Sequence, residues 1–218
     1  MELSLIQKII VWIVPLLFAI TLHEVAHGFV ANWFGDKTAK LAGRLTLNPL
    51  KHIDLIGTII IPLVMLIFSP FIFGWAKPVP VDPRNLHHPR RDMAFVALAG
   101  PMANLIMAVI WALIAKGGLL LTGSNNTWLG LPLIYMGEAG LMLNLVLGIL
   151  NLIPLPPLDG GNILLSILPK RAAYYAHRIE PYSFYILVLL LFSGILSNII
   201  YPLVTMLIGG ISQWFGLP

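Results

Sequence analysis

Long apolar stretches divide the chain into segments that match a membrane in length. They cover residues 3–22, 55–76, 93–115, 128–158 and 182–217. About 20 such residues span a bilayer as a helix. The apolar residues run continuously instead of alternating, as they would in a membrane β-barrel. The pattern therefore predicts an all-α polytopic membrane protein with about five or six membrane segments.

The composition agrees with a membrane protein and restricts the chemistry of the chain. Only 10% of the 218 residues are charged, whereas a soluble domain needs about a quarter. There is no cysteine, so any metal must be held by histidine and carboxylate side chains. The basic residues lie between the apolar stretches, which indicates loops beside a lipid bilayer and not a nucleic-acid surface. The histidines of these loops, His52, His87 and His88, are expected to face solvent or lipid headgroups.

The basic residues also indicate the orientation of the chain. The stretch 55–74 contains Pro62 and Pro70, and a bent, re-entrant path is tolerated where protein covers the backbone. If this stretch crosses the membrane, the 13 Lys and Arg residues divide eight against five between the two sides. If it is re-entrant, they divide eleven against two. Cytoplasmic loops carry the excess of Lys and Arg, so we favour the re-entrant path and an external N-terminus.

The sequence His23-Glu24-Val25-Ala26-His27 ends the first apolar stretch and forms the H-E-x-x-H pattern. Residues four apart lie one turn apart on one face of a helix, so both imidazoles can bind the same zinc ion. Glu24 can then take the proton from a zinc-bound water. Ionisable residues in a membrane are costly unless they face a cavity, which favours a functional site over a polar patch at a helix end.

A catalytic zinc site usually has three protein ligands, so a third one is needed. Asp159 is the strongest candidate, because apolar residues precede it and Gly160 and Gly161 follow it in an otherwise uncharged stretch. The alternative is a turn aspartate before glycines. With the favoured orientation, His27 and Asp159 both lie a few helical turns from the cytoplasmic ends of their segments.

Three motifs in order along the chain resemble the site-2 proteases, a family of intramembrane zinc metalloproteases. They are His23-Glu24-Val25-Ala26-His27, Ala99-Gly100-Pro101-Met102-Ala103-Asn104, and the stretch from Asn151 to Gly161 that contains Leu158-Asp159-Gly160. Residues Gly74 to Val81 are also similar to a segment of the short bacterial members, which lack added soluble domains. Many members carry a further span before the H-E-x-x-H helix, and none precedes it here.

The resemblance implies one zinc ion held by His23, His27 and Asp159, with Glu24 as the general base. It implies hydrolysis of peptide bonds in or near the transmembrane segments of membrane-protein substrates, as in regulated intramembrane proteolysis. The implied location is the bacterial cytoplasmic membrane, with the active site nearer the cytoplasmic face.

The expected organisation is a single membrane-embedded metalloprotease domain over residues 1–218, because no repeat, low-complexity tract or long linker divides the chain. The three motifs imply a three-helix catalytic core at about 4–165. C-terminal helices are expected at about 182–217, crossing once or twice.

Two amides and two valines are further candidates for the site. Asn104 and Asn151 lie in apolar surroundings, where either amide can stabilise an oxyanion or join helices by hydrogen bonds. The prolines around Val79 and Val81 exclude a helix interior and suggest an extended segment. An unwound substrate can add to such a segment as a strand.

Two other functions use similar residues. A metal or proton transporter also needs intramembrane His and Asp, but polar residues are then expected along a full path through the bilayer, whereas here they cluster near one face. A catalytically inactive metal-binding scaffold would keep the helices without needing Glu24. Replacing Glu24 with glutamine distinguishes these functions from a protease, because only a protease loses cleavage while keeping zinc.

Overall fold

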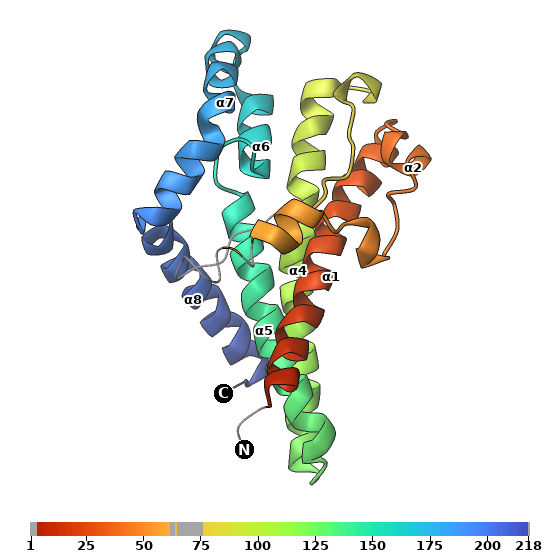
Figure 1. Cartoon of the computed structure of the whole chain (residues 1–218), viewed down its shortest axis with the longest axis vertical. Helices are drawn as coiled ribbons and strands as arrows, with labels where there is room; N and C mark the ends of the chain where they lie inside the picture. The colour runs from red at the N-terminus through yellow and green to blue at the C-terminus, as the bar shows by residue number, and fades with distance from the viewer. Residues whose placement is uncertain (1–3, 62–63, 65–75, 218) are drawn as a thin grey trace.

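The computed structural model describes residues 4–61, 64 and 76–217, which form a bundle of long helices with shorter helices gathered at one end (Figure 1). Four helices of this part are long and apolar enough to cross a membrane: α1 (Leu5–Trp33), α4 (Pro89–Gly123), α5 (Thr127–Asn151) and α8 (Ile195–Phe215). The others are α2 (Thr38–Leu41), η1 (Pro49–Lys51), η2 (Leu55–Ile60), η3 (Pro83–Asn85), α6 (Asp159–Ile167) and α7 (Lys170–Phe192). The described ranges contain no strand, which confirms the predicted all-α polytopic membrane protein.

The stretch 55–74, for which a re-entrant path is predicted, lies mostly outside the described residues. Of this stretch, the structure describes only η2, Ile61 and Val64. The C-terminal region forms two helices, which are separated at Gly194 with φ +76°. The first of them, α7, begins at Lys170, earlier than the predicted start near residue 182, because helical structure continues through a polar half that hydropathy does not detect.

Local sequence explains where the long helices begin and end. α1 begins in a capping box, in which the Ser4 hydroxyl accepts from the Gln7 N–H and the Gln7 side chain accepts from the Ser4 N–H. Such reciprocal bonds satisfy two of the free N–H groups of a first turn. α4 begins with Pro89, whose fixed φ and missing N–H suit the first helical position.

Small residues allow α4 and α5 to pack closely. A Cβ atom added at Gly137 of α5 would lie 2.6 Å from the main-chain nitrogen of Ala115, and one added at Gly140 would lie 2.7 Å from Cδ1 of Trp111. Membrane helices associate mainly through such close contacts. Beside this contact, Leu141 and Leu145 of α5 join Ala108 and Ala112 of α4 and Val204 of α8 in an apolar core.

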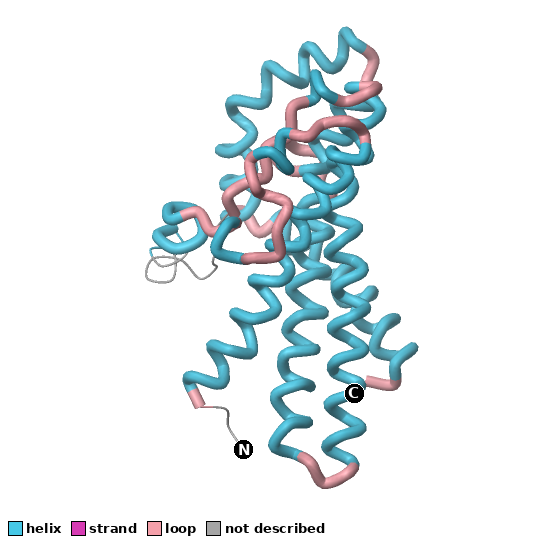
Figure 2. The backbone as a smooth tube through the Cα atoms, turned by 90° about the vertical axis from the view of Figure 1, so that its right-hand side faces the viewer, coloured by secondary structure: helices cyan, strands magenta, loops and turns pink. Residues whose placement is uncertain are grey.

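The helices place the three sequence motifs toward one end of the bundle. Both chain termini lie at the opposite end, and the first half of α1 diverges there from α4 and α5 (Figure 2). Toward the other end α1 packs against α4, and α6 lies beside the beginning of α4. The last third of α1, the first half of α4 and the start of α6 therefore surround a common region.

Candidate metal centre

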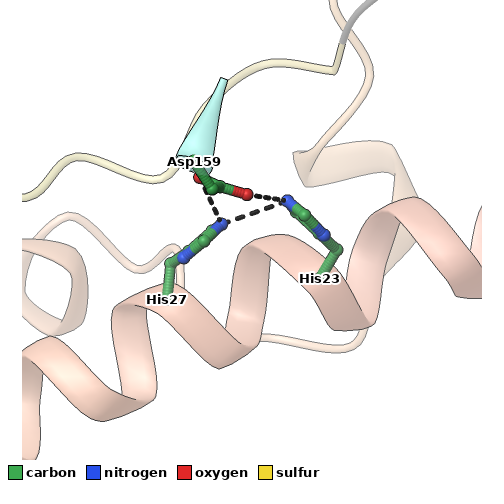
Figure 3. Close-up of side chains that lie close together, drawn as sticks. All are labelled: His23, His27 and Asp159. Atoms are coloured by element: carbon green, nitrogen blue, oxygen red, sulfur yellow. Dashed lines mark hydrogen bonds and ion pairs between the residues drawn. The ribbon is translucent and has the colours of Figure 1, made fainter. Parts of the chain in front are cut away.

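Two histidines of α1 and the first residue of α6 bring three ligand-type side chains together (Figure 3). The Nε2 atom of His23 lies 3.1 Å from Nε2 of His27 and 3.1 Å from Oδ2 of Asp159. The Nε2 atom of His27 lies 3.3 Å from Oδ1 of Asp159. The residues predicted as metal ligands are thus neighbours in space, and their side chains are only 11–14% exposed.

The other ring nitrogen of each histidine determines which nitrogen carries the proton. His27 Nδ1 lies 2.7 Å from the main-chain carbonyl oxygen of Val96, which can only accept, so Nδ1 carries a hydrogen. His23 Nδ1 lies 2.5 Å from Oδ1 of Asn104. The amide nitrogen of Asn104 faces Asn144 Oδ1 at 3.0 Å, so its oxygen faces the histidine and accepts. In the neutral rings both Nε2 atoms therefore carry lone pairs.

This proton arrangement suits a bound cation. Two Nε2 lone pairs and a carboxylate face one another, and Asp159 Oδ2 accepts no hydrogen bond within the described part of the chain. Such a group of acceptors is unfavourable without a positive charge between them. Ligand atoms 2.0–2.2 Å from a tetrahedral zinc ion are about 3.3 Å from one another, close to the observed separations. The residues present therefore fit zinc, which two imidazoles and one carboxylate would hold.

Glycines allow the neighbouring backbones to reach this centre. A Cβ atom at Gly100 of α4 would lie 2.6 Å from His27 Cε1 and 2.7 Å from His23 Cε1. A Cβ atom at Gly161 would lie 2.7 Å from Cα of Pro156. Only hydrogen fits at these positions, so α4 covers the two imidazoles directly and the turn before α6 folds back against its first residues.

Glu24 lies next to His23 in sequence and is held by a residue far along the chain. Its Oε2 accepts a hydrogen bond from the Val79 N–H at 2.8 Å. The Val79 side chain is 7% exposed and packs over Gly28, where an added Cβ atom would lie 2.8 Å from Val79 Cγ1. Val79, predicted to contact substrate, thus also contacts the predicted general base.

The two candidate amides have different surroundings. Asn104 is 1% exposed, and its amide nitrogen donates to Asn144 Oδ1, while Asn144 donates to the Gly140 carbonyl at 2.8 Å. Both polar atoms of Asn104 are therefore already used, one of them on His23. Asn151 is half-buried, and its amide donates to the Leu147 carbonyl of its own helix at 2.9 Å.

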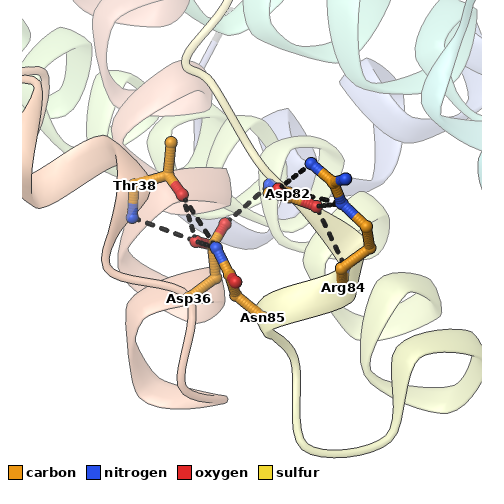
Figure 4. A network of polar contacts seen from close by, with 5 residues as sticks. All are labelled: Asp36, Thr38, Asp82, Arg84 and Asn85. Atoms are coloured by element: carbon orange, nitrogen blue, oxygen red, sulfur yellow. Dashed lines mark hydrogen bonds and ion pairs between the residues drawn. The ribbon is translucent and has the colours of Figure 1, made fainter.

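A second polar network lies beyond the end of α1 (Figure 4). Asp36 is fully buried and accepts from the N–H of Thr38 at 3.0 Å, the N–H of Asp82 at 2.8 Å and the Asn85 amide at 3.1 Å. Burial alone would raise the pKa of Asp36, but the hydrogen bonds, led by that of the Thr38 hydroxyl, hold its pKa below the ordinary value. The Arg84 guanidinium likewise lowers the pKa of Asp82. This network joins the end of α1 to residues 82–85.

The structure corrects one expectation about the loop histidines. His87 and His88 are exposed as predicted, but His52 is 2% exposed, and its Nε2 lies 2.9 Å from the Thr46 carbonyl oxygen. Arg44 in the same loop is also buried, at 8% exposed. Both residues are polar and lie in a loop between apolar stretches, so hydropathy gave no signal of their burial.

Comparisons with known proteins point in one direction. The family model described as peptidase family M50 matches residues 126–194. The chain is 38% identical over 195 residues to YwhC of Bacillus subtilis (strain 168), covering 88% of this chain and 84% of that protein, whose name describes a zinc metalloprotease. It is 29% identical over 204 residues to Rip2 of Mycolicibacterium smegmatis, with 93% and 74% covered. It is 27% identical over 212 residues to zinc metalloprotease MJ0392 of Methanocaldococcus jannaschii, with 94% and 50% covered. No solved structure matches.

Proposed function

The chain belongs to peptidase family M50 and is a membrane-embedded zinc metalloprotease, and from this premise we propose that it cleaves the transmembrane segments of other membrane proteins. We propose that His23, His27 and Asp159 hold one zinc ion and that Glu24 is the general base. The observation that carries this proposal is the convergence of two imidazole lone pairs and a carboxylate, one residue from Glu24. Zinc bound there supplies a Lewis acid that polarises the scissile carbonyl and makes water more acidic.

The protein's own groups then move the protons. Glu24 takes a proton from the attacking water while the water oxygen forms a bond to the carbonyl carbon of the substrate. The carbon–nitrogen bond breaks, and Glu24 gives the proton to the departing amine. The Val79 N–H holds Oε2 of Glu24 at 2.8 Å, while Oε1 accepts no hydrogen bond among the residues described and is free for the water proton.

The location of the site supports a membrane substrate. His27 lies six residues before Trp33, the last residue of α1, which is about 9 Å along the helix axis. The reacting bond is therefore below the surface, in an apolar part of the bundle. If the basic loops face the cytoplasm, the site is nearer that face of the bacterial cytoplasmic membrane. A substrate helix must unwind there, because its carbonyl groups are otherwise hydrogen-bonded.

We propose that the unwound substrate pairs with the chain at Val79 and Val81. The Val79 N–H is used by Glu24, but within the described part of the chain the Val79 carbonyl and the Val81 N–H and carbonyl have no hydrogen bond. These groups offer one side of a strand to an extended peptide. Proline at Val81 removes the donor, so it is expected to raise KM about tenfold, the effect of losing one hydrogen bond. An unchanged KM would exclude strand pairing at this residue.

The amides are assigned to different roles in this proposal. Asn104 orients His23, because both of its polar atoms are engaged away from substrate. Asn151 is the better candidate for stabilising the oxyanion, since its amide only donates to a carbonyl of its own helix, and such a bond is easily exchanged. If the Asn151 amide donated to the oxyanion in place of the Leu147 carbonyl, it would raise kcat and leave substrate affinity unchanged.

The proposal is tested with purified protein, its zinc content and a panel of single-span membrane substrates. Wild type is expected to bind one zinc ion and cleave a subset of the panel. Glu24→Gln is expected to keep zinc and lose cleavage, and Asp159→Ala is expected to lose both. Cleavage by Glu24→Gln at the wild-type rate would refute the mechanism, and a change in metal flux across vesicles would favour a transporter.

A further inference from the structure

Residues 77–82, which we call the strap, cross the catalytic helix at Gly28, one turn after Glu24. The main contact is between Val79 and Gly28, where an added Cβ atom would also lie 2.6 Å from Cδ2 of Leu45. The strap is hydrogen-bonded to the proposed general base, because the Val79 N–H donates to Oε2 of Glu24. The position of the strap along α1 therefore determines where that N–H lies.

Arg44 holds the strap on the upstream side of Val79. One terminal nitrogen of its guanidinium donates to the Lys77 carbonyl at 2.8 Å and to the Pro78 carbonyl at 3.3 Å. The Lys77 N–H donates to the His52 carbonyl at 2.9 Å. Pro78 has no N–H, so its carbonyl is the only main-chain polar group it offers. Arg44 thus engages the two residues immediately before the one that contacts Glu24.

The conformation of the loop after α1 brings Arg44 to this place. α2 ends at Leu41, and Gly43, just beyond its C-cap, has φ +64°. The Gly43 N–H and Arg44 N–H donate to the carbonyls of Lys40 and Ala39 at 3.0 and 2.9 Å. This is the left-handed helix stop that glycine favours. Asp36, at the other end of α2, holds the strap through the Asp82 N–H at 2.8 Å. The two ends of one short helix therefore fix the two ends of the strap.

The burial of Arg44 is costly and indicates a specific role. The residue is 8% exposed, its Nε has no hydrogen-bond partner and it forms no ion pair with a described carboxylate. A buried charge without an opposite charge is strongly unfavourable unless its hydrogen bonds compensate. A neutral or solvent-exposed side chain at this position would avoid the cost. What the buried guanidinium gains is its pair of hydrogen bonds to the strap.

We propose that Arg44 is a positioning residue of the protease. By fixing the carbonyls of Lys77 and Pro78, it holds the Val79 N–H on Oε2 of Glu24 and leaves Oε1 directed at the water. This inference rests on the proposed role of Glu24 as general base. Without the guanidinium the strap shifts along α1, the carboxylate loses its donor and turns among its rotamers, and a smaller fraction of molecules is ready to accept the proton.

The test compares Arg44→Gln and Arg44→Lys with a matched control, Lys40→Gln, which removes an exposed basic side chain from α2. The substrate is the single-span protein of the panel that wild type cleaves fastest. Arg44→Gln is expected to lower kcat about 10- to 100-fold, the effect of misplacing a catalytic group by about 1 Å, with zinc content unchanged. KM should rise by no more than about tenfold, the effect of losing one hydrogen bond between the shifted strap and the substrate. Arg44→Lys should restore part of kcat, because it keeps a donor. Lys40→Gln should behave as wild type.

A second variant identifies the route of the effect. Val79→Pro removes the N–H that Glu24 accepts, so it should lower kcat to a similar extent. The double variant Arg44→Gln/Val79→Pro should be no worse than the poorer single variant, because both changes remove the same contact. If Arg44→Gln does not accumulate as folded protein, Arg44→Lys is measured in its place.

Three results would overturn the inference: wild-type kcat in Arg44→Gln, loss of zinc in Arg44→Gln, or effects of the two changes that multiply. Failure of the proposed function gives a different result. In that case the wild type does not cleave, or Glu24→Gln cleaves as well as wild type. Loss of cleavage in Glu24→Gln together with normal kcat in Arg44→Gln refutes only the role of Arg44.

Discussion

Replacement of Gly100 by alanine would place a methyl group inside the proposed metal centre. The added carbon would lie 2.6 Å from Cε1 of His27 and 2.7 Å from Cε1 of His23. Non-bonded carbon atoms prefer about 3.5–4.0 Å, so each ring must move by about 1 Å. Neither ring can move freely, because the Nδ1 atom of each is hydrogen-bonded to α4, one to Asn104 and the other to the Val96 carbonyl.

The expected loss of zinc affinity follows from this displacement. Ligand distances in metal sites hold to about ±0.2 Å, so a shift of about 1 Å breaks at least one coordinate bond. Disturbing only the groups behind the ligands weakens binding about 10- to 100-fold, and Gly100→Ala should weaken it by at least the upper value. The helix itself should remain, because alanine is favoured over glycine in a helix by about 1 kcal/mol. Zinc affinity is measured by titration in metal buffers, with melting temperature as the check on folding.

A control on the same helix separates the steric effect from the change in helix propensity. Gly117 also belongs to α4, and apart from its own helix backbone no described atom lies within 4 Å of its added Cβ. Gly117→Ala should therefore bind zinc as wild type does and melt at the same temperature or slightly higher. Wild-type zinc affinity and cleavage in Gly100→Ala would refute the reasoning, since they would mean that the imidazoles are not confined by α4.

Three further predictions concern other residues around the site. Asn104→Leu should lower zinc affinity about 10- to 100-fold, because His23 loses the acceptor that orients it, and a variant with normal zinc affinity would exclude that role. Asp36 stabilises the fold above its ordinary pKa of 3.8, and this stability is lost as pH falls through its lower folded-state pKa. Melting temperatures of wild type should therefore fall more steeply below about pH 4 than those of Asp36→Asn, and parallel curves would contradict this. Gly161→Ala should push the turn before α6 away and displace Asp159, which zinc content and cleavage measure together; full zinc occupancy would show that the turn can adjust.

The helical fold and the meeting of the ligand residues could be predicted from local features of the sequence. His23 and His27 are four residues apart, so a single helix places them on one face. Asp159 is a costly carboxylate in an apolar stretch, and few other acids were available to join them. Both signals depend on residue type and spacing, which the sequence contains directly.

The groups that hold these ligands could not be predicted, for different physical reasons. The partner of His27 is the main-chain carbonyl of Val96, and a carbonyl is present at every residue. Asn144, which holds Asn104, is an amide in an apolar span and could have been considered for the same reason as Asn104. Arg44 and His52 are buried and hydrogen-bonded to a strap that lies far from them in sequence, and hydropathy describes only local burial.

The two imidazoles differ in how far mutation can alter them. The orientation of His23 depends on the side chain of Asn104. Evolution or an engineer can therefore change the basicity of His23 and its affinity for the ion by substituting Asn104. The orientation of His27 depends on the peptide backbone of a helix, which no exchange of side chain at Val96 removes. One of the two proposed ligands can thus be tuned by mutation while its neighbour stays constant. Variation in metal preference or turnover among related chains should therefore be concentrated around His23.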